Sequence, residues 1–124
     1  MENKWKNQSF YNSLKNALNG IKYVLSDGRN VRIQICFAIV AIVLGFVLKI
    51  SLIEFLILIL TIFFVLVSEF INTALENLAD LYTTEYNEKV KNIKDIAAGT
   101  VTLAAVASII VGIIIFLPKI LNFI

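Results

Sequence analysis

The chain has 124 residues, of which 59% are hydrophobic and 16% are charged, with a formal net charge of +2. Its mean hydropathy of +0.85 exceeds what a water-soluble domain of this length can bury, so the composition predicts a single-domain integral membrane protein. The small net charge argues against a nucleic-acid partner. With no histidine and only Cys36, histidine catalysis, a disulfide framework and a cysteine metal site are excluded.

The first predicted element is an amphipathic helix over about residues 9–25. Its apolar residues recur at helical spacing on one face, while Lys15, Lys22 and several asparagines take the other. The segment is too polar to cross a bilayer but suits a helix lying on the membrane surface. A soluble-type helix packed on the bundle would lie at the same boundary.

Three apolar segments long enough to cross a membrane follow, at about residues 33–48, 52–81 and 96–117. A turn signal at residues 26–30 separates the first from the amphipathic helix. The second is longer than the roughly 30 Å hydrocarbon core requires, and its excess is polar. Pro118 is expected to stop the third. The sequence therefore predicts an all-α membrane protein with three transmembrane helices and an N-terminal amphipathic surface helix.

The basic residues are distributed unevenly between the two predicted sides of the membrane. Only Lys49 and Lys119 fall on one side. The other side has Lys4, Lys6, Lys15, Lys22, Arg29, Arg32, Lys89, Lys91 and Lys94. The positive-inside rule then predicts a cytoplasmic N-terminus and a cytoplasmic polar end of the second span.

That polar end carries a stripe of Glu69, Asn72, Thr73, Glu76 and Asp80, which fall within roughly one quadrant of a helix. Charges at membrane depth are costly and normally face a bundle interior or a cavity. Carboxylate and carboxamide oxygens suit Mg²⁺, which usually binds together with phosphates. The stripe therefore predicts a metal–nucleotide site, with its first carboxylate at the level of the lipid headgroups.

Lys94 and Asp95 are expected to begin the third helix. A lysine neutralises phosphate charge, and a helix N-terminus with Ala97, Ala98 and Gly99 would allow close approach of a ligand. This set of groups fits phosphoryl transfer to a lipid hydroxyl. A polar seam between helices and the lining of an ion pathway remain alternatives. There is no Walker loop, protein-kinase motif or GxSxG elbow.

Five short motifs carry a family resemblance. They are Gly20-Ile21-Lys22-Tyr23, Arg29-Asn30-x-Arg32-Ile33, Glu69-x-x-Asn72-Thr73-Ala74-Leu75-Glu76-x-x-x-Asp80, Glu85-Tyr86 and Lys94-Asp95-x-Ala97-Ala98-Gly99. In these the chain resembles the small prokaryotic diacylglycerol kinase family of integral membrane lipid kinases. It is most similar to the Gram-positive branch, whose members phosphorylate undecaprenol.

The resemblance implies a homotrimer in the bacterial cytoplasmic membrane, with active sites shared between subunits and with ATP, Mg²⁺ and a lipid alcohol as ligands. The acceptor would be undecaprenol, or alternatively diacylglycerol. Glu69 would be the general base that takes the lipid hydroxyl proton, and Asn72 and Glu76 would hold Mg²⁺. The residues implied to shape the nucleotide site are Asp80, Glu85, Asn87, Lys94 and Asp95.

The chain departs from the family pattern at two positions. Gly28 stands where the family usually has a glutamate that is a second metal ligand, and the neighbouring Asp27 would have to replace it. Asn87 stands where a histidine is common, so this position cannot titrate. Because of Gly28, a non-catalytic helical membrane subunit or a small channel stays open as a different class of function.

Overall fold

The computed structural model describes residues 9–124, apart from the side chain of Arg29; Lys4 and Lys6 of the topology prediction lie outside this part. It contains four helices, α1 (Phe10–Asp27), α2 (Arg29–Val47), α3 (Leu52–Tyr82) and α4 (Glu88–Phe123). No strand occurs within the described residues. Three of the helices, α2, α3 and α4, are long and apolar enough to cross a membrane. The predicted all-α membrane fold is confirmed.

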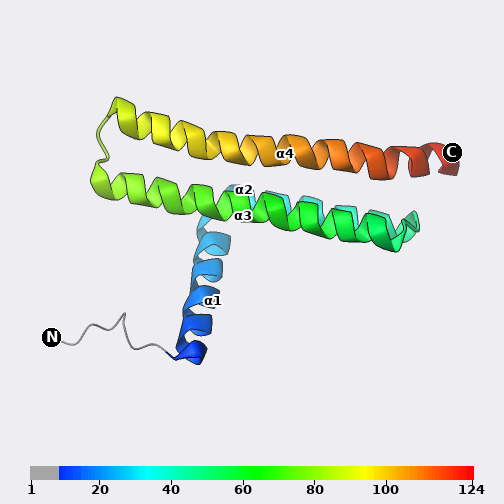
Figure 1. The fold of residues 1–124 in the computed structure, drawn as a ribbon, viewed down its shortest axis with the longest axis horizontal. Helices are drawn as coiled ribbons and strands as arrows, with labels where there is room; N and C mark the ends of the chain where they lie inside the picture. The colour runs from blue at the N-terminus through cyan, green and yellow to red at the C-terminus, as the bar shows by residue number, and fades with distance from the viewer. Residues whose placement is uncertain (1–8) are drawn as a thin grey trace.

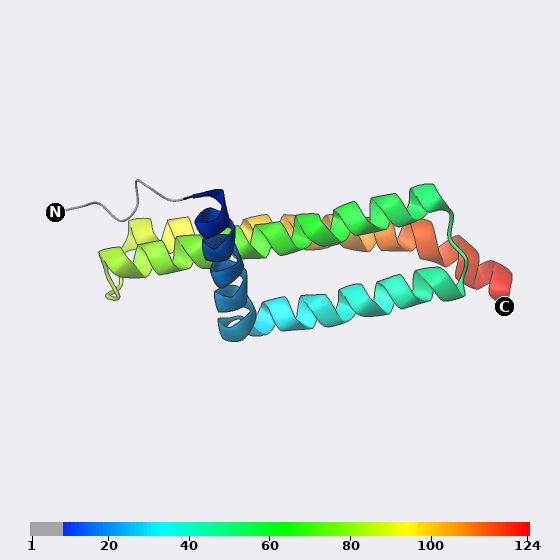
Figure 2. The same cartoon turned by 90° about the horizontal axis from the view of Figure 1, so that it is seen from below.

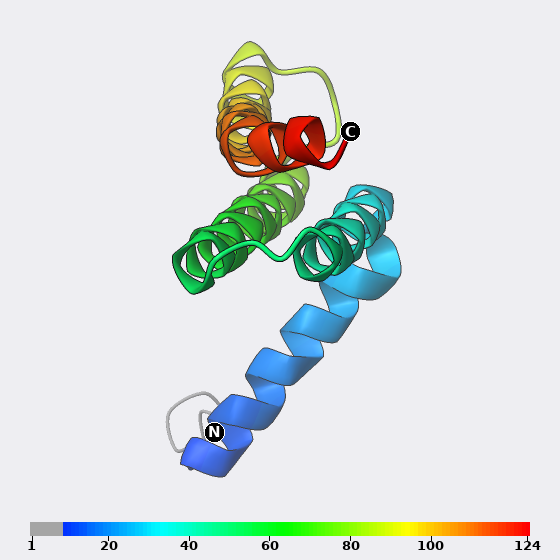
Figure 3. The same ribbon diagram turned by 90° about the vertical axis from the view of Figure 1, so that its right-hand side faces the viewer.

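The three long helices run side by side, and each is antiparallel to the next along the chain (Figures 1 and 2). In contrast, α1 leaves this bundle at a steep angle (Figure 1). Seen along the bundle, α1 extends away from the start of α2 (Figure 3). When α2, α3 and α4 cross a bilayer, this angle lays α1 along its surface, as an interfacial helix requires.

A single residue, Gly28, makes the corner between α1 and α2, where the turn signal predicted a longer break. The Gly28 backbone N–H donates to the Val24 carbonyl oxygen at 2.8 Å. Arg32 Nη2 donates to the Ser26 carbonyl oxygen at 3.0 Å. Since the last carbonyls of a helix lack intrahelical partners, both bonds satisfy orphan groups and fix the corner.

The ends of α4 differ from the prediction. Asn87 caps the helix, because its Oδ1 accepts from the backbone N–H groups of Lys89 and Val90 at 3.0 and 3.1 Å. The helix thus begins at Glu88, and Lys94 lies in its second turn. The prediction that Lys94 opens the helix is wrong, because hydropathy marks where a span becomes apolar and not where its helix starts.

The prediction that Pro118 ends this helix is also wrong, since α4 continues to Phe123. A proline inside a helix removes one hydrogen bond and disturbs the preceding turn. Just before it, however, Ile115 and Phe116 are buried in the small core with Ile50 and Leu58. The packing of these two α4 side chains against Leu58 of α3 and against Ile50 therefore holds the helix in place through the proline.

Candidate active site

The polar stripe of α3 changes from buried to exposed along the helix. The side chains of Glu69 and Asn72 are only 6% and 8% exposed, whereas Glu76 and Asp80 are exposed. Asp80 is eleven positions after Glu69, which is about 16 Å along the helix at 1.5 Å per residue. The deepest carboxylate is thus shielded from lipid by the protein itself, and the outer two are open to solvent.

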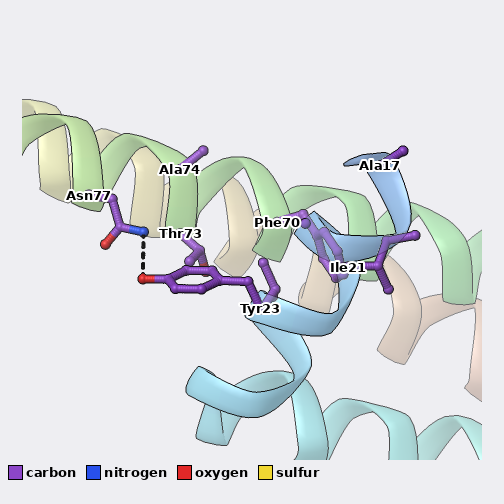
Figure 4. Close-up of a pocket in the computed structure, with 9 residues that line it drawn as sticks. Ala17, Ile21, Tyr23, Phe70, Thr73, Ala74 and Asn77 are labelled. Atoms are coloured by element: carbon purple, nitrogen blue, oxygen red, sulfur yellow. Dashed lines mark hydrogen bonds between the residues drawn. The ribbon is translucent and has the colours of Figure 1, made fainter. Parts of the chain in front are cut away.

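The place where α1 packs against α3 relates the polar stripe to the predicted membrane surface. A hollow of about 360 Å³ lies between α1 and α3, lined on the α3 side by Phe70, Thr73, Ala74 and Asn77 (Figure 4). The Asn77 side-chain nitrogen donates to the Tyr23 hydroxyl at 3.4 Å and ties the two helices together. With α1 along the surface of the bilayer, as predicted, Glu69 would fall just to the bilayer side of α1.

Glu69 contacts a residue from another helix. Gln34 Nε2 on α2 donates to Glu69 Oε2 at 3.4 Å. Gln34 belongs to none of the sequence motifs that predict the site. A signal was present, because this residue is the only strongly polar one between Ile33 and Leu48. What the sequence could not show is that the antiparallel packing of α2 on α3 brings the two side chains together.

Asn72 and Glu76 form the next contact along the stripe. Asn72 Nδ2 donates to Glu76 Oε1 at 3.3 Å, while the buried Asn72 Oδ1 has no partner among residues 9–124. A buried acceptor without a partner is costly in a native protein and calls for a ligand or water. With the Asn72 amide turned over, its oxygen would face the accessible Glu76 carboxylate, and the two side chains would offer a pair of hard oxygen donors, which fits Mg²⁺.

This pair cannot form a complete metal cage alone. Within the described residues there is no group of three or more acidic, histidine or cysteine side chains that could hold a metal ion. Magnesium typically keeps several waters and binds through one or two carboxylates plus substrate phosphates. Asn72 and Glu76 therefore fit a metal that arrives with a nucleotide.

Asp80 joins the stripe to α4. Its Oδ1 accepts from Lys94 Nζ at 2.7 Å, across the two helices. Both side chains are substantially exposed, so the ion pair contributes little to stability. Its effect is to hold a cationic group beside the acidic stripe, where a phosphate can compete for it. The structure thus brings together two residues that were predicted to bind the nucleotide.

In the part of the chain that the structure describes, the other predicted nucleotide residues have local contacts only. Asp95 accepts from Lys91 at 2.7 Å one turn earlier on the exposed face of α4. Glu85 is exposed in the connector between α3 and α4, and the Asn87 side-chain oxygen is used as the cap of α4. Asn87 retains its side-chain N–H groups for a ligand.

The prediction of an anion site formed by Ala97, Ala98 and Gly99 at the start of α4 is wrong. Ala97, Ala98 and Gly99 lie well inside the helix, where backbone N–H groups bond to carbonyls of the preceding turn. Ala97 is buried as well. These residues therefore cannot present free N–H groups to a phosphate.

At Gly28, where the family usually has a glutamate, the structure leaves no room for a side chain. A Cβ atom added at Gly28 would lie 2.9 Å from the Val24 carbonyl oxygen and 3.4 Å from Val31 Cγ2. Val31 is fully buried, so it has no room to move aside. The neighbouring Asp27 is exposed, and no hydrogen bond or ion pair joins it to Asn72 or Glu76 within the described residues. Its role as a metal ligand stays a prediction.

Replacing Gly28 with alanine is expected to destabilise the protein by about 1–2 kcal/mol, since the added methyl group overpacks the corner. Gly20→Ala in α1 is the matched control, because a Cβ there meets nothing within 4 Å. This variant is expected to be neutral or slightly stabilising. Unfolding in detergent followed by circular dichroism measures both. Equal stability of Gly28→Ala and the wild type would contradict the steric argument.

The comparisons with known proteins cover most of the chain. Residues 15–116 match a family described as prokaryotic diacylglycerol kinase. An undecaprenol kinase of Bacillus subtilis (strain 168) is 37% identical over 110 residues, which cover 89% of each protein. A diacylglycerol kinase of Synechocystis sp. is 38% identical over 111 residues, which cover 89% of this chain and 63% of that protein. The match includes the whole polar stripe.

Proposed function

Because the chain belongs to the prokaryotic diacylglycerol kinase family and is a lipid kinase, we propose that it phosphorylates undecaprenol with ATP. The undecaprenol kinase of Bacillus subtilis supports this acceptor, since the alignment covers 89% of both proteins. The alternative acceptor is diacylglycerol, which the similarity to the Synechocystis enzyme favours. With the chain identified as a kinase, a non-catalytic subunit or channel no longer needs to be considered.

One observation carries the proposed mechanism: the stripe on α3 is buried at Glu69 and exposed at Glu76. A lipid alcohol reaches the site from the bilayer and a nucleotide reaches it from water, so the two substrates meet between these residues. The positive-inside rule makes this water the cytoplasm, where ATP is available.

In the proposed reaction, Glu69 accepts the proton of the lipid hydroxyl. The hydroxyl oxygen forms a bond to the γ-phosphorus, and the bond from that phosphorus to the β–γ bridging oxygen breaks, so ADP leaves. Catalysis of this kind depends mainly on positioning and charge neutralisation. Burial of Glu69 keeps bulk water away from the attacking oxygen.

Asn72 and Glu76 would hold Mg²⁺, which would neutralise phosphate charge when bound with ATP. Lys94 lies on the neighbouring helix, paired with Asp80 at 2.7 Å, and can release this partner to contact a phosphate. Glu85, Asn87 and Asp95 would shape the nucleotide site, and Asp27 would approach the metal. The proposal includes a homotrimer, in which a neighbouring subunit covers part of the exposed apolar surface.

The test uses the purified protein with labelled ATP, Mg²⁺ and either undecaprenol or diacylglycerol, and follows the chloroform-extractable label. We expect transfer to both lipids to require Mg²⁺ and the rate with undecaprenol to be the higher. Faster transfer to diacylglycerol would reverse the assignment of the acceptor, and no transfer to either would reject the proposed reaction. Light scattering on the same preparation measures the protein mass, for which a trimer is expected.

A further inference from the structure

Gln34 is a polar side chain in the segment from Ile33 to Leu48, which is otherwise apolar. It lies on α2, and its Nε2 donates to Glu69 Oε2 on α3 at 3.4 Å. Its own Oε1 is buried and has no partner within the described residues. An uncharged amide at membrane depth with only part of its hydrogen-bonding capacity used is a cost to stability. Packing alone would favour an apolar residue at this position.

The contact with Glu69 determines the orientation of the amide. A carboxylate can only accept, so the amide nitrogen must face it and the amide oxygen must turn away. The donor–acceptor distance is longer than the usual 2.7–3.2 Å range, so the bond contributes little to stability as it stands. Catalytic hydrogen bonds are often long without substrate and shorten in the complex.

We propose that Gln34 is a positioning residue for the Glu69 carboxylate. This inference rests on the proposed function, in which Glu69 takes the proton of the lipid hydroxyl. By holding Oε2, the Gln34 amide fixes the rotation of the carboxylate and leaves Oε1 for the lipid alcohol. The position of the base is then set from α2, and α3 alone does not determine it.

The test compares three purified variants. Gln34→Met keeps the length of the side chain without a donor, and Gln34→His supplies an N–H donor at a similar reach. Cys36→Ala is the control, because Cys36 is an exposed residue of the same helix. For each variant, kcat, the KM values for ATP and lipid, and the unfolding temperature in detergent are measured.

We expect Gln34→Met to lower kcat by roughly tenfold to a hundredfold, the range expected when a catalytic group is slightly misplaced. Its KM values should stay within about twofold of the wild type, because positioning affects the reacting state more than binding. Its unfolding temperature should be unchanged or higher, since an apolar side chain replaces an incompletely bonded amide. Gln34→His should recover most of kcat, and Cys36→Ala should match the wild type.

A Gln34→Met protein with wild-type kcat would overturn the inference while leaving the proposed function intact. The inference also fails if Gln34→Met loses kcat and stability together and Gln34→His restores neither, because that pattern describes a structural role. A wild-type protein that phosphorylates no lipid would instead overturn the proposed function and this inference with it.

Discussion

Replacement of Glu69 with glutamine is expected to lower kcat by roughly 10²–10⁴-fold, the usual contribution of a general base. Glutamine has nearly the same size and can still lie beside Gln34, but it cannot take a proton from the lipid hydroxyl. Glu69 is buried, and the part of the stripe proposed to bind the nucleotide lies further along α3. Binding of Mg²⁺ and ATP should therefore survive the substitution.

The measurement combines the labelled-lipid assay with titration of a fluorescent ATP analogue in the presence of Mg²⁺. Glu54→Gln is the matched control, because Glu54 lies on the same helix at its opposite end. There its carboxylate accepts from the backbone N–H of Ser51 at 2.9 Å in a capping box. This variant should be less stable but should turn over normally. Near-normal turnover in Glu69→Gln would reject Glu69 as the base.

The sequence predicted the helical architecture and the polar stripe well, because both follow from periodicity. The stripe depends on the spacing of Glu69, Asn72 and Glu76 within one continuous helix, and α3 is continuous through this region. The burial of Glu69 could also be expected, because a charge at this depth cannot face lipid. Properties that depend on one helix alone are therefore the ones that can be predicted from the sequence.

Features that depend on particular hydrogen bonds or on packing between helices were missed. The contact of Gln34 with Glu69 exists only because α2 packs on α3. The corner at Gly28 is formed by groups several residues apart, such as the Arg32 guanidinium and the Ser26 carbonyl oxygen. The start of α4 depends on the cap at Asn87, whose polar surroundings resemble a loop in a hydropathy profile. In each case the structure depends on hydrogen bonds or packing that the hydropathy and periodicity of the sequence do not show.

The corner at Gly28 also changes how the departure from the family is tested. Restoring a glutamate there adds a carboxylate and a steric clash together, because the Cβ atom alone meets the Val24 carbonyl oxygen. A Gly28→Glu variant must therefore be compared with Gly28→Ala and not with the wild type. Only the difference between the two variants reports on metal binding.

Replacement of Glu76 with glutamine is expected to raise the Mg²⁺ concentration for half-maximal activity by roughly tenfold to a hundredfold. Mg²⁺ strongly prefers anionic oxygen ligands, and the substitution removes the charge while keeping an oxygen at a similar position. The Asn72 side-chain oxygen would remain as the neutral ligand of the proposed pair. At saturating Mg²⁺ much of the activity should return, since Glu69 is unchanged and still serves as the base.

The experiment is a Mg²⁺ titration of lipid phosphorylation at fixed ATP. Glu88→Gln is the control, since it removes an exposed carboxylate from the first turn of α4, outside the polar stripe. The control should titrate like the wild type. An unchanged titration for Glu76→Gln would reject Glu76 as a metal ligand. A fall in kcat that excess Mg²⁺ does not reverse would instead indicate that this carboxylate positions the nucleotide directly. Because Glu69→Gln should behave in the opposite way, with a low kcat and an unchanged Mg²⁺ requirement, the two variants together separate proton transfer from metal binding along one helix.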